Sequence, residues 1–363
     1  MSQQNSKGPL TGLKIVEFES IGPGPFATML LCDMGADVIR ISRNGSIQKG
    51  MDSITSRGRK IISLDLKKAE DVEKAKALCA KADVLIEGFR PQVMERLGLG
   101  PNDLHVINPA LIYGRMTGWG QTGPKAHLAG HDMNYISITG ALAAIGPSQD
   151  TAPVPPLNLV GDYAGGSMYL IMGILSALYE RQSSGLGQVI DTAMCDGASS
   201  IMTMFYDMHA HGLWQNKRSA NLLDGGAPFY STYRCQDGKD IALGPIEPQF
   251  WQLFCEKVER PEWLNSGRTP DQWQSFKPEL TALFLTKTQQ QWCDLLEDSD
   301  ACFSPILNMS EAPNHPHMQA RQAFIQLDGI TQPAPAPRFS RTPQAHPTSA
   351  QQISVDDALQ NWG

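Results

Sequence analysis

The chain has 363 residues, of which 41% are hydrophobic and 18% charged, so its composition is that of a globular protein with enough material for two or three domains. Thirty basic residues stand against 37 acidic ones, a formal net charge of −7, which argues against a nucleic-acid binder. An anionic ligand would therefore need a local basic patch.

The sequence carries no sign of a membrane span or of secretion. The longest apolar run, Met168 to Leu178, is interrupted by Gly173 and Ser176 and is shorter than the roughly 20 residues that a bilayer requires. The polar residues Met1 to Gly8 lack the apolar core of a signal peptide. The seven cysteines are odd in number and none has Cys-x-x-Cys spacing, which is typical of reduced thiols, so we expect a cytoplasmic location.

The first half of the chain alternates apolar strands with helices. Strands are predicted at residues 13–18, 36–41, 61–64, 83–86 and 111–113, and helices from the turn at 22–25 to residue 34, at 67–82 and at 93–97. Strand, helix and strand again is the unit that builds a parallel sheet. We therefore expect an α/β fold, with a doubly wound parallel-sheet large domain over residues 1–224.

The second half changes character. An apolar helix is predicted at 162–179, a strand at 188–191 and a Met-rich helix at 193–209, and then the pattern breaks at Asp224–Pro228. Residues 229–235 and 241–243 read as a hairpin, which places a smaller α+β domain at 225–308. The proline-rich residues 309–363 are expected to form an extended linker and a C-terminal helix that returns to the large domain.

The turn Gly22-Pro23-Gly24-Pro25 could suggest a phosphate-binding loop. The dinucleotide fingerprint needs a third glycine, however, and Pro25 stands where a backbone N–H would be wanted. A nicotinamide dehydrogenase is therefore disfavoured, although the turn still brings backbone close to whatever binds above the sheet.

Basic residues are frequent in the first hundred positions, and several follow predicted strands, where the crevice of an open α/β sheet binds its ligand. They are Arg40, Arg43, Arg57, Arg59, Lys60, Lys67, Arg90 and Arg96. Any one of them could be a solvated surface charge. Taken together in an acidic chain, they indicate a polyanionic small molecule such as a nucleotide or coenzyme A.

Two short motifs supply candidate acid/base groups. His131 lies in Gly130-His-Asp-Met-Asn-Tyr135, and Asp162 lies in Asn158-Leu-Val-Gly-Asp-Tyr-Ala-Gly-Gly166. A histidine beside a glycine-rich corner and an aspartate at the start of an apolar helix can move a proton on and off one carbon. Alone, the histidine could instead satisfy a loop backbone, and the aspartate could be a helix N-cap.

These motifs, with several others, resemble the α-methylacyl-CoA racemase branch of the family III CoA-transferase superfamily. The resemblance runs from about Gly8 to the final helix. Besides the two motifs above, it rests on residues 8–17, 37–40, 82–91, 96–99 and 117–124.

The resemblance implies a two-domain subunit in an interlocked homodimer, with a coenzyme A thioester bound at the large domain. The residues that it implies for the coenzyme A site are Arg43, Leu64, Asp65, Leu66, Lys67, Gly88, Phe89, Arg90 and Arg96. Those that it implies for the thioester end are Gly130, Asp132, Met133, Asn134 and Tyr135, around His131.

The resemblance further implies that His131 and Asp162 act as opposing acid/base groups on C2 of a 2-methylacyl-CoA substrate. Glu247, in the sequence Pro-Ile-Glu-Pro-Gln-Phe, would orient the histidine. No cofactor is expected, since coenzyme A is part of the substrate. No metal is expected either, because the pairs His209/His211 and His315/His317 have the wrong spacing for one helix face.

Two alternatives remain open. In the first, Asp162 is the nucleophile of a CoA-transferase that works through a mixed anhydride and an acyl-enzyme. The contexts of His131 and Glu247, and the lack of a four-glycine run, favour proton transfer instead. In the second, the protein only binds CoA thioesters, which the two intact candidate bases disfavour. The sequence does not fix the acyl chain.

Overall fold

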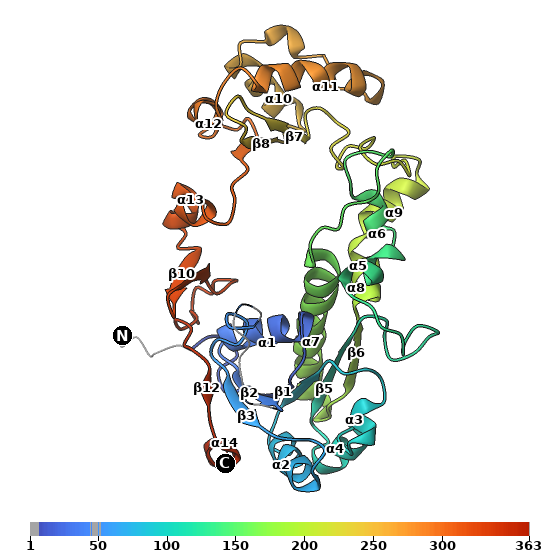
Figure 1. Ribbon diagram of the computed structural model, residues 1–363, viewed down its shortest axis with the longest axis vertical. Helices are drawn as coiled ribbons and strands as arrows, with labels where there is room; N and C mark the ends of the chain where they lie inside the picture. Colours follow the sequence, from blue (N-terminus) through green and yellow to red (C-terminus); the bar gives the residue numbers. More distant parts are fainter. Residues whose placement is uncertain (1–6, 44, 46–49, 51, 363) are drawn as a thin grey trace. The chain divides into compact units, whose positions relative to one another are not determined.

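The computed structural model describes residues 7–43, 45, 50 and 52–362, and its internal contacts divide the chain into two units (Figure 1). The large unit comprises Met1–Thr139, Leu157–Met202 and Gln322–Gly363, and the small unit comprises Gly140–Pro156 and Thr203–Arg321. The sequence predicted domains at residues 1–224, 225–308 and 309–363. These domain limits stay a prediction.

A seven-stranded parallel sheet forms the centre of the large unit. Continuous apolar runs such as Val84-Leu85-Ile86 supply the surface that a strand covered on both faces requires. The strands are β1 (Lys14–Phe18), β2 (Asp37–Ser42), β3 (Lys60–Ser63), β4 (Val84–Glu87), β5 (Ile112–Thr117), β6 (Val189–Ala193) and β12 (Gln351–Gln352). Their order is β12-β3-β2-β1-β4-β5-β6, and every pairing is parallel, which confirms the predicted α/β class.

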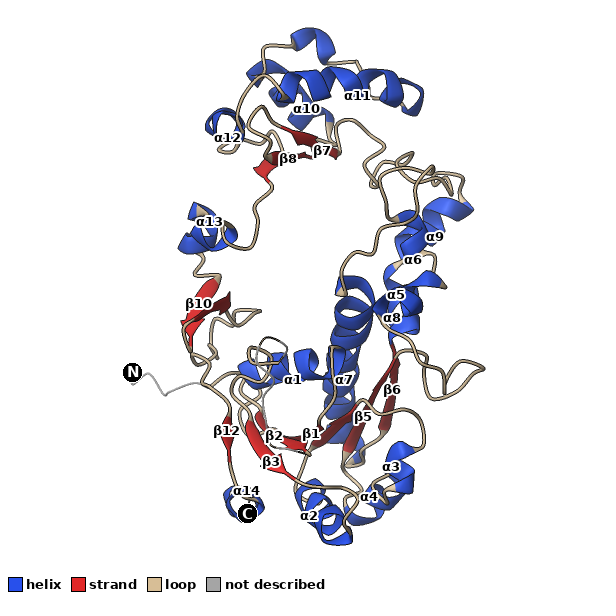
Figure 2. Cartoon of the chain, in the orientation of Figure 1, coloured by secondary structure: helices blue, strands red, loops and turns tan. Residues whose placement is uncertain are grey.

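Helices cover both faces of this sheet (Figure 2). On one face lie α2 (Ala69–Cys79), α3 (Val93–Arg96), α4 (Pro101–Ile107) and α14 (Val355–Asn361), packed on a core that includes Val16 and Leu85. On the other lie α1 (Pro23–Asp33), α7 (Tyr169–Ser184) and α8 (Met194–Ile201), packed on a core that includes Ile15 and Val84. Successive residues of one strand thus enter opposite cores, as the strand's two-residue period requires.

The strand order creates a switch point between β1 and β4. The chain proceeds from β1 to β2 and β3 on one side, and β4, β5 and β6 follow on the other side. In sheets of this kind, ligands bind in the crevice beyond the carboxyl ends of the strands at the switch point. The loops that begin at Glu19 and at Gly88 leave the sheet at that place.

The predicted helix at 162–179 begins as a wider turn. Residues Leu159–Met168 form a π-helical segment, η1, which continues directly into α7. Its glycines let backbones meet, since a Cβ on Gly165 would lie 2.7 Å from the backbone nitrogen of Ala198, and one on Gly197 would lie 1.9 Å from the carbonyl oxygen of Gly165. Gly165 of the second motif and Gly197 of α8 therefore allow η1 to pack closely against α8. Turns of this kind often occur at functional sites.

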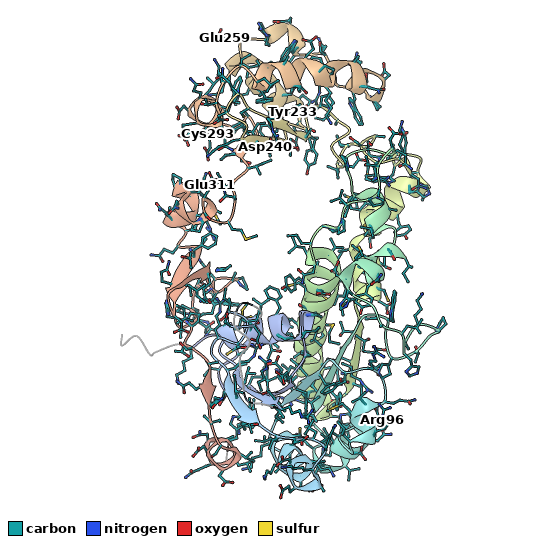
Figure 3. All side chains as sticks on the ribbon, viewed as in Figure 1. Arg96, Tyr233, Asp240, Glu259, Cys293 and Glu311 are labelled. Carbon is teal, nitrogen blue, oxygen red and sulfur yellow. The ribbon has the colours of Figure 1, made fainter. Side chains whose placement is uncertain are left out.

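The small unit is built on an antiparallel sheet with an aromatic core. Its strands are β7 (Ser231–Arg234), β8 (Asp240–Leu243) and β9 (Phe303–Pro305), in the order β7-β8-β9. The ring of Tyr233 on β7 stacks on Phe284 with centroids 5.1 Å apart; Tyr233 and Asp240 mark the first two strands in Figure 3. The predicted hairpin is confirmed. The helical segments are α6 (Ala141–Ala144), α9 (Thr203–Ala210), α10 (Pro248–Lys257), η2 (Pro261–Trp263), α11 (Pro270–Phe284), α12 (Gln289–Leu296), η3 (Ala312–Asn314) and α13 (Pro316–Ala320).

Two sequence expectations are corrected. The Met-rich helix predicted at 193–209 is two helices, because it breaks at Met202, whose N–H bonds to Ser199 three residues back instead of four. The tail is not simply extended, since β10 (Phe324–Leu327) and β11 (Ile330–Pro333) form an antiparallel hairpin before β12 joins the sheet. Among the described residues, no helix is long and apolar enough to cross a membrane.

Candidate active site

A cavity of about 460 Å³ lies at the carboxyl ends of β1, β4, β5 and β6 in the large unit. The loops after β1 and β4, the segment after β5 and parts of both motifs form its wall. Among the residues that line it are Gly22, Gly88, Phe89, Arg90, Gly130, His131, Tyr135 and Asp162. The structure therefore brings the two predicted acid/base residues into one cavity at the switch point of the sheet.

Asp162 lies in the first turn of η1 and is partly buried. Its Oδ2 accepts a hydrogen bond from Nδ2 of Asn158 at 3.1 Å. Burial raises the pKa of the Asp162 carboxyl above its ordinary value; the Asn158 hydrogen bond opposes this shift, and the negative charge of Asp132 adds to it. The carboxyl group thus holds a proton more readily than a free aspartate does, which suits a group that must both accept and donate one.

Gly22 leaves room for this carboxylate. The residue has φ +70°, and a Cβ at its position would lie 2.9 Å from Oδ2 of Asp162. A side chain would therefore strain the backbone and push against the carboxylate. This close approach gives the first glycine of the Gly22-Pro-Gly-Pro25 turn a role that does not involve phosphate.

His131 precedes the short helix α5 (Asp132–Ser137), where it is the N-cap residue. Its backbone N–H donates to Oδ1 of Asn134 at 3.0 Å, which fixes the start of the helix. The side chain is exposed to the cavity that Asp162 also lines, and the charge of a protonated His131 would lower the pKa of Asp162. The charge state of His131 thus affects the proton affinity of Asp162.

Tyr135 holds the loop that carries His131. Its hydroxyl donates to the carbonyl oxygen of Gly130, and its ring meets the ring of Trp119 edge-on with centroids 4.8 Å apart. A Cβ on Gly118 would lie 2.0 Å from this ring, so glycine is required there. The tyrosine predicted to hold the thioester end therefore also has a packing role.

Asp132 is buried and contacts the Asp162 segment. Its Oδ2 accepts the backbone N–H of Asp162 at 2.7 Å, and a Cβ on Gly161 would lie 2.5 Å from the same oxygen. Its Oδ1 is buried without a hydrogen-bond partner among the described residues. Asp132 was predicted to bind the thioester, and the structure shows that its carboxylate joins the two motifs. Met133 and Asn134 are exposed on α5 and do not line the cavity.

A second cavity of about 260 Å³ lies beside the first, at the carboxyl ends of β1, β2, β3 and β4. It brings together the predicted coenzyme A residues Arg43, Leu64, Asp65, Leu66, Lys67 and Phe89. Phe89 lines both cavities, whereas Arg90 lines only the first. A ligand with an anionic end and a long arm could therefore occupy both cavities by passing over the loop after β4.

Arg96 lines neither cavity. It is exposed at the end of α3, where Figure 3 labels it. Its neighbours Leu97 and Glu95 connect it to the site, because Leu97 lines the second cavity and Glu95 pairs with Arg115 of β5. The predicted role of Arg96 in binding coenzyme A stays a prediction.

Glu247 is exposed at the N-terminus of α10 in the small unit. Among the described residues, its side chain has no hydrogen-bond partner that would identify a function within that unit. Its predicted contact with His131, which belongs to the large unit, stays a prediction.

The proposed basic patch is smaller than the sequence suggested. Arg59 is fully buried, with its Nε 2.7 Å from Oε2 of Glu17, and Arg57 is buried against Asp33. Arg40 is likewise buried and pairs with Glu19 and Asp52. These arginines are paired with carboxylates of the fold itself. Of the eight cations that the sequence suggested, only Arg43, Lys67 and Arg90 line the two cavities.

Several wall residues were not found from the sequence alone. Asn158 bonds to Asp162, and its position four residues earlier in the same motif is a signal that could have found it. Ser20, Ile21 and Trp119 also line the first cavity. Among the described residues, no group of three or more His, Cys, Asp or Glu side chains could hold a metal ion.

The comparison with known protein families identifies the class to which this fold belongs. The model of CoA-transferase family III matches residues 10–352, so the chain belongs to that family. Solved structures of similar fold include a CAIB/BAIF family protein from Brucella suis, with a TM-score of 0.79, 25% identity and 98% of both chains covered.

Within the family, the chain is similar to proteins named alpha-methylacyl-CoA racemase. It is 42% identical to the one from Mus musculus over 351 residues, which cover 96% of this chain and 91% of the relative. It is 40% identical to the one from Homo sapiens, with 92% and 87% covered. The acetyl-CoA:oxalate CoA-transferase of Acetobacter aceti is 30% identical, with 94% and 91% covered. The predicted resemblance is therefore confirmed.

Proposed function

We propose that this chain is an isomerase that interconverts the R and S forms of 2-methylacyl-CoA thioesters. The observation that carries the proposal is the single cavity lined by His131 and by Asp162, whose pKa is raised. Two distinct acid/base groups in one cavity are what inversion of a C–H centre requires. The two relatives named alpha-methylacyl-CoA racemase, at 42% and 40% identity, support the same reaction.

In the proposed reaction, one of the two residues removes the C2 proton as a base. The electron pair of the broken C–H bond moves toward the thioester carbonyl and gives an enolate. The other residue then donates its proton to the opposite face of C2. The raised pKa of Asp162 brings its proton affinity closer to that of histidine, so each residue can serve as the acid for one enantiomer and as the base for the other.

The developing enolate oxygen needs hydrogen-bond donors. Helix α5 begins directly after His131. The N–H groups of Asn134 and Tyr135 donate to the carbonyl oxygen of His131, whereas those of Asp132 and Met133 have no backbone acceptor among the described residues. We propose that these N–H groups donate to the enolate oxygen. A role of this kind agrees with the predicted assignment of residues 130–135 to the thioester end.

We propose that the second cavity receives the nucleotide portion of coenzyme A. Arg43 and Lys67 offer cations there, while Leu64, Leu66 and Phe89 offer apolar surface. The pantetheine arm would pass over Phe89 and bring the thioester to His131 and Asp162. No cofactor takes part in this reaction, because coenzyme A belongs to the substrate.

We also propose that the protein is a homodimer in which Glu247 of one subunit orients His131 of the other. The homodimer is supported by an apolar stripe that is exposed along η1 and α7. The stripe comprises Met168, Met172, Leu175 and Tyr179, which are 42%, 56%, 37% and 77% exposed and repeat at helical spacing. An exposed apolar face of this kind is typical of a protein–protein interface.

We propose a cytoplasmic location for the protein. All seven cysteines are free, which agrees with this proposal.

CoA transfer is the alternative. Asp162 would then attack a thioester as a nucleophile, and the Acetobacter aceti relative named a CoA-transferase, at 30% identity, makes this worth testing. It is the weaker reading, because the racemase-named relatives are more similar to this chain.

One experiment separates the two reactions. A single enantiomer of a 2-methylacyl-CoA is incubated with the protein in deuterium oxide, together with a free carboxylic acid as a possible CoA acceptor. We expect deuterium at C2 and loss of optical purity, with no CoA on the added acid. CoA on the acid, with C2 unexchanged, would overturn the racemase proposal.

A further inference from the structure

The loop after β4 occupies a central position between the two cavities. Its residue Phe89 lines both, and its residue Arg90 lines the cavity of His131 and Asp162. The loop has little freedom to move toward β1, since a Cβ on Gly88 would lie 2.9 Å from Cβ of Ser20. The contacts that hold this loop in place therefore determine how the two cavities are joined.

Glu87, the last residue of β4, holds the loop from inside the fold. Its side chain is 1% exposed. Oε2 accepts the backbone N–H of Phe89 at 2.7 Å, and Oε1 accepts Nε of Arg115 at 2.9 Å. One carboxylate thus anchors the loop backbone with one oxygen and a β5 side chain with the other.

Arg115 extends this anchor to α3. Its Nη1 and Nη2 donate to the two carboxylate oxygens of Glu95 at 2.8 Å and 3.2 Å. Glu95 stands next to Arg96, and Leu97, the following residue, lines the second cavity. The chain of contacts Glu87–Arg115–Glu95 therefore connects the loop of the first cavity to the helix beside the second.

We infer that Glu87, Arg115 and Glu95 are positioning residues that hold the loop after β4 and helix α3 in the arrangement that receives coenzyme A. A buried ion pair contributes little net stability compared with apolar residues of the same size, and in some proteins its role is to specify the arrangement of its partners. Here the fixed partners are the backbone of Phe89 and the start of the segment that carries Leu97. The inference rests on the proposed function and concerns binding of the coenzyme, not the chemistry at C2.

The network gives coenzyme A binding a pH dependence of its own. Burial raises the pKa of Glu87 to about 7, although the Phe89 N–H and Arg115 oppose the shift, and Glu95 adds to it. The titratable and charged groups around Glu87 are Tyr113 and Arg115 on β5 and Glu95 on α3. Ionised Glu87 accepts the hydrogen bonds from the N–H of Phe89 and from Arg115. When Glu87 is protonated, one of its oxygens carries the proton and must donate a hydrogen bond instead of accepting one. As the pH falls through about 7, the loop loses an anchor and affinity should fall.

The test is calorimetric titration of free coenzyme A into the full-length protein between pH 5.5 and 8.5. The variants are Glu87→Gln and Glu95→Gln, and the matched control is Glu73→Gln, which removes an exposed carboxylate from α2 in the same unit. Phosphate groups of the ligand also titrate near pH 6. The informative quantity is therefore the ratio of the variant dissociation constant to that of the unaltered protein at each pH.

We expect Glu87→Gln to weaken binding about tenfold at pH 8 and by less than threefold at pH 5.5, because the unaltered residue is then protonated. In an exchange assay this variant should raise KM and leave kcat within about twofold. Glu95→Gln should move the transition to lower pH, since it removes a negative charge that favours protonated Glu87. Glu73→Gln should follow the unaltered protein throughout.

A constant ratio of one for Glu87→Gln across the pH range would overturn the inference. If that variant does not fold, as judged by circular dichroism, Glu95→Gln decides, and an unmoved transition would overturn the inference equally. The unaltered protein could bind coenzyme A and exchange C2 normally while the ratio of dissociation constants for Glu87→Gln stays at one. That result would contradict this inference and leave the proposed function standing. Failure of the unaltered protein to bind coenzyme A would overturn both this inference and the proposed function.

Discussion

The backbone N–H of Asp162 donates to the carboxylate of Asp132 at 2.7 Å, so the residue next to His131 holds the segment that carries the second candidate base. The bond spans two motifs that are separate in sequence, and both lie at the same cavity. It ties the segment of Asp162 to the start of the helix that follows His131. The negative charge of Asp132 also raises the pKa of Asp162.

Replacing Asp132 by Asn should retain an acceptor for the Asp162 N–H and remove the charge. The pKa of Asp162 should then fall, because its ionised form no longer faces a second carboxylate. In the pH profile of C2 exchange, the limb that reports Asp162 should move to lower pH. The rate should drop about tenfold, less than the roughly 10²- to 10⁴-fold that a general acid or base contributes, because both groups stay in place. Asp298→Asn, at an exposed position of the small unit, is the control. An unmoved limb would contradict the assigned coupling.

Replacing Asn158 by Ala should shift the same limb in the opposite direction. Its Nδ2 donates to Oδ2 of Asp162 at 3.1 Å and thereby favours the ionised carboxylate. Loss of this bond should raise the pKa of Asp162 further and move the limb to higher pH. The comparison of Asp132→Asn with Asn158→Ala in one assay is decisive, because shifts of the same sign would show that the limb does not belong to Asp162.

Gly22→Ala should impair exchange through direct pressure on Asp162. The added Cβ would lie 2.9 Å from Oδ2 of Asp162, so the carboxylate must move. Gly12→Ala is a matched control, since Gly12 also has a positive φ, +95°, but has no atom within 4 Å of its would-be Cβ. Both variants should lose about 1 kcal/mol of unfolding free energy from backbone strain. Only Gly22→Ala should lower the exchange rate by more than about tenfold; equal rates in the two variants would refute the steric argument.

Glu87 makes the stability of the free protein depend on pH. Its folded-state pKa of about 7 exceeds the ordinary value of 4.5, so the folded protein binds this proton more tightly. The resulting stabilisation is complete below about pH 4.5 and is lost as the pH rises through about 7. The difference corresponds to up to about 3 kcal/mol.

Urea unfolding of the unaltered protein and of Glu87→Gln at pH 5 and pH 8 measures this effect. From pH 5 to pH 8, the unaltered protein should lose stability relative to the variant by up to about 3 kcal/mol. Parallel changes in the two proteins would mean that Glu87 titrates near its ordinary value in the folded state.

The sequence predicted the strands and helices of the large unit well, because each is a local pattern. An apolar run such as Val84-Leu85-Ile86 indicates a strand that is buried on both faces, and this signal does not depend on which strands lie next to it. The order of the sheet is not local in this sense. Strand β12, formed by Gln351 and Gln352, has no apolar pattern and is defined only by its pairing with β3.

The candidate site was predicted in part for the same reason. His131 and Asp162 stand in recognisable motifs, and the structure brings them to one cavity. Arg57 and Arg59 were read as ligand-binding cations because their partners, Asp33 and Glu17, are remote in sequence and carry no local signal. Glu87 was missed in the same way, since its partner Arg115 lies on another strand.

The central claim is that His131 and Asp162 are two different bases that address opposite faces of C2. Each enantiomer of a 2-methylacyl-CoA should therefore be incubated separately in deuterium oxide with His131→Ala and with Asp162→Asn, and deuterium at C2 should be followed by mass spectrometry. We predict that both variants lose racemisation, and that each still exchanges one enantiomer, a different one in the two variants, through its remaining base. Exchange of the same enantiomer by both variants, or full racemisation by either, would contradict the claim.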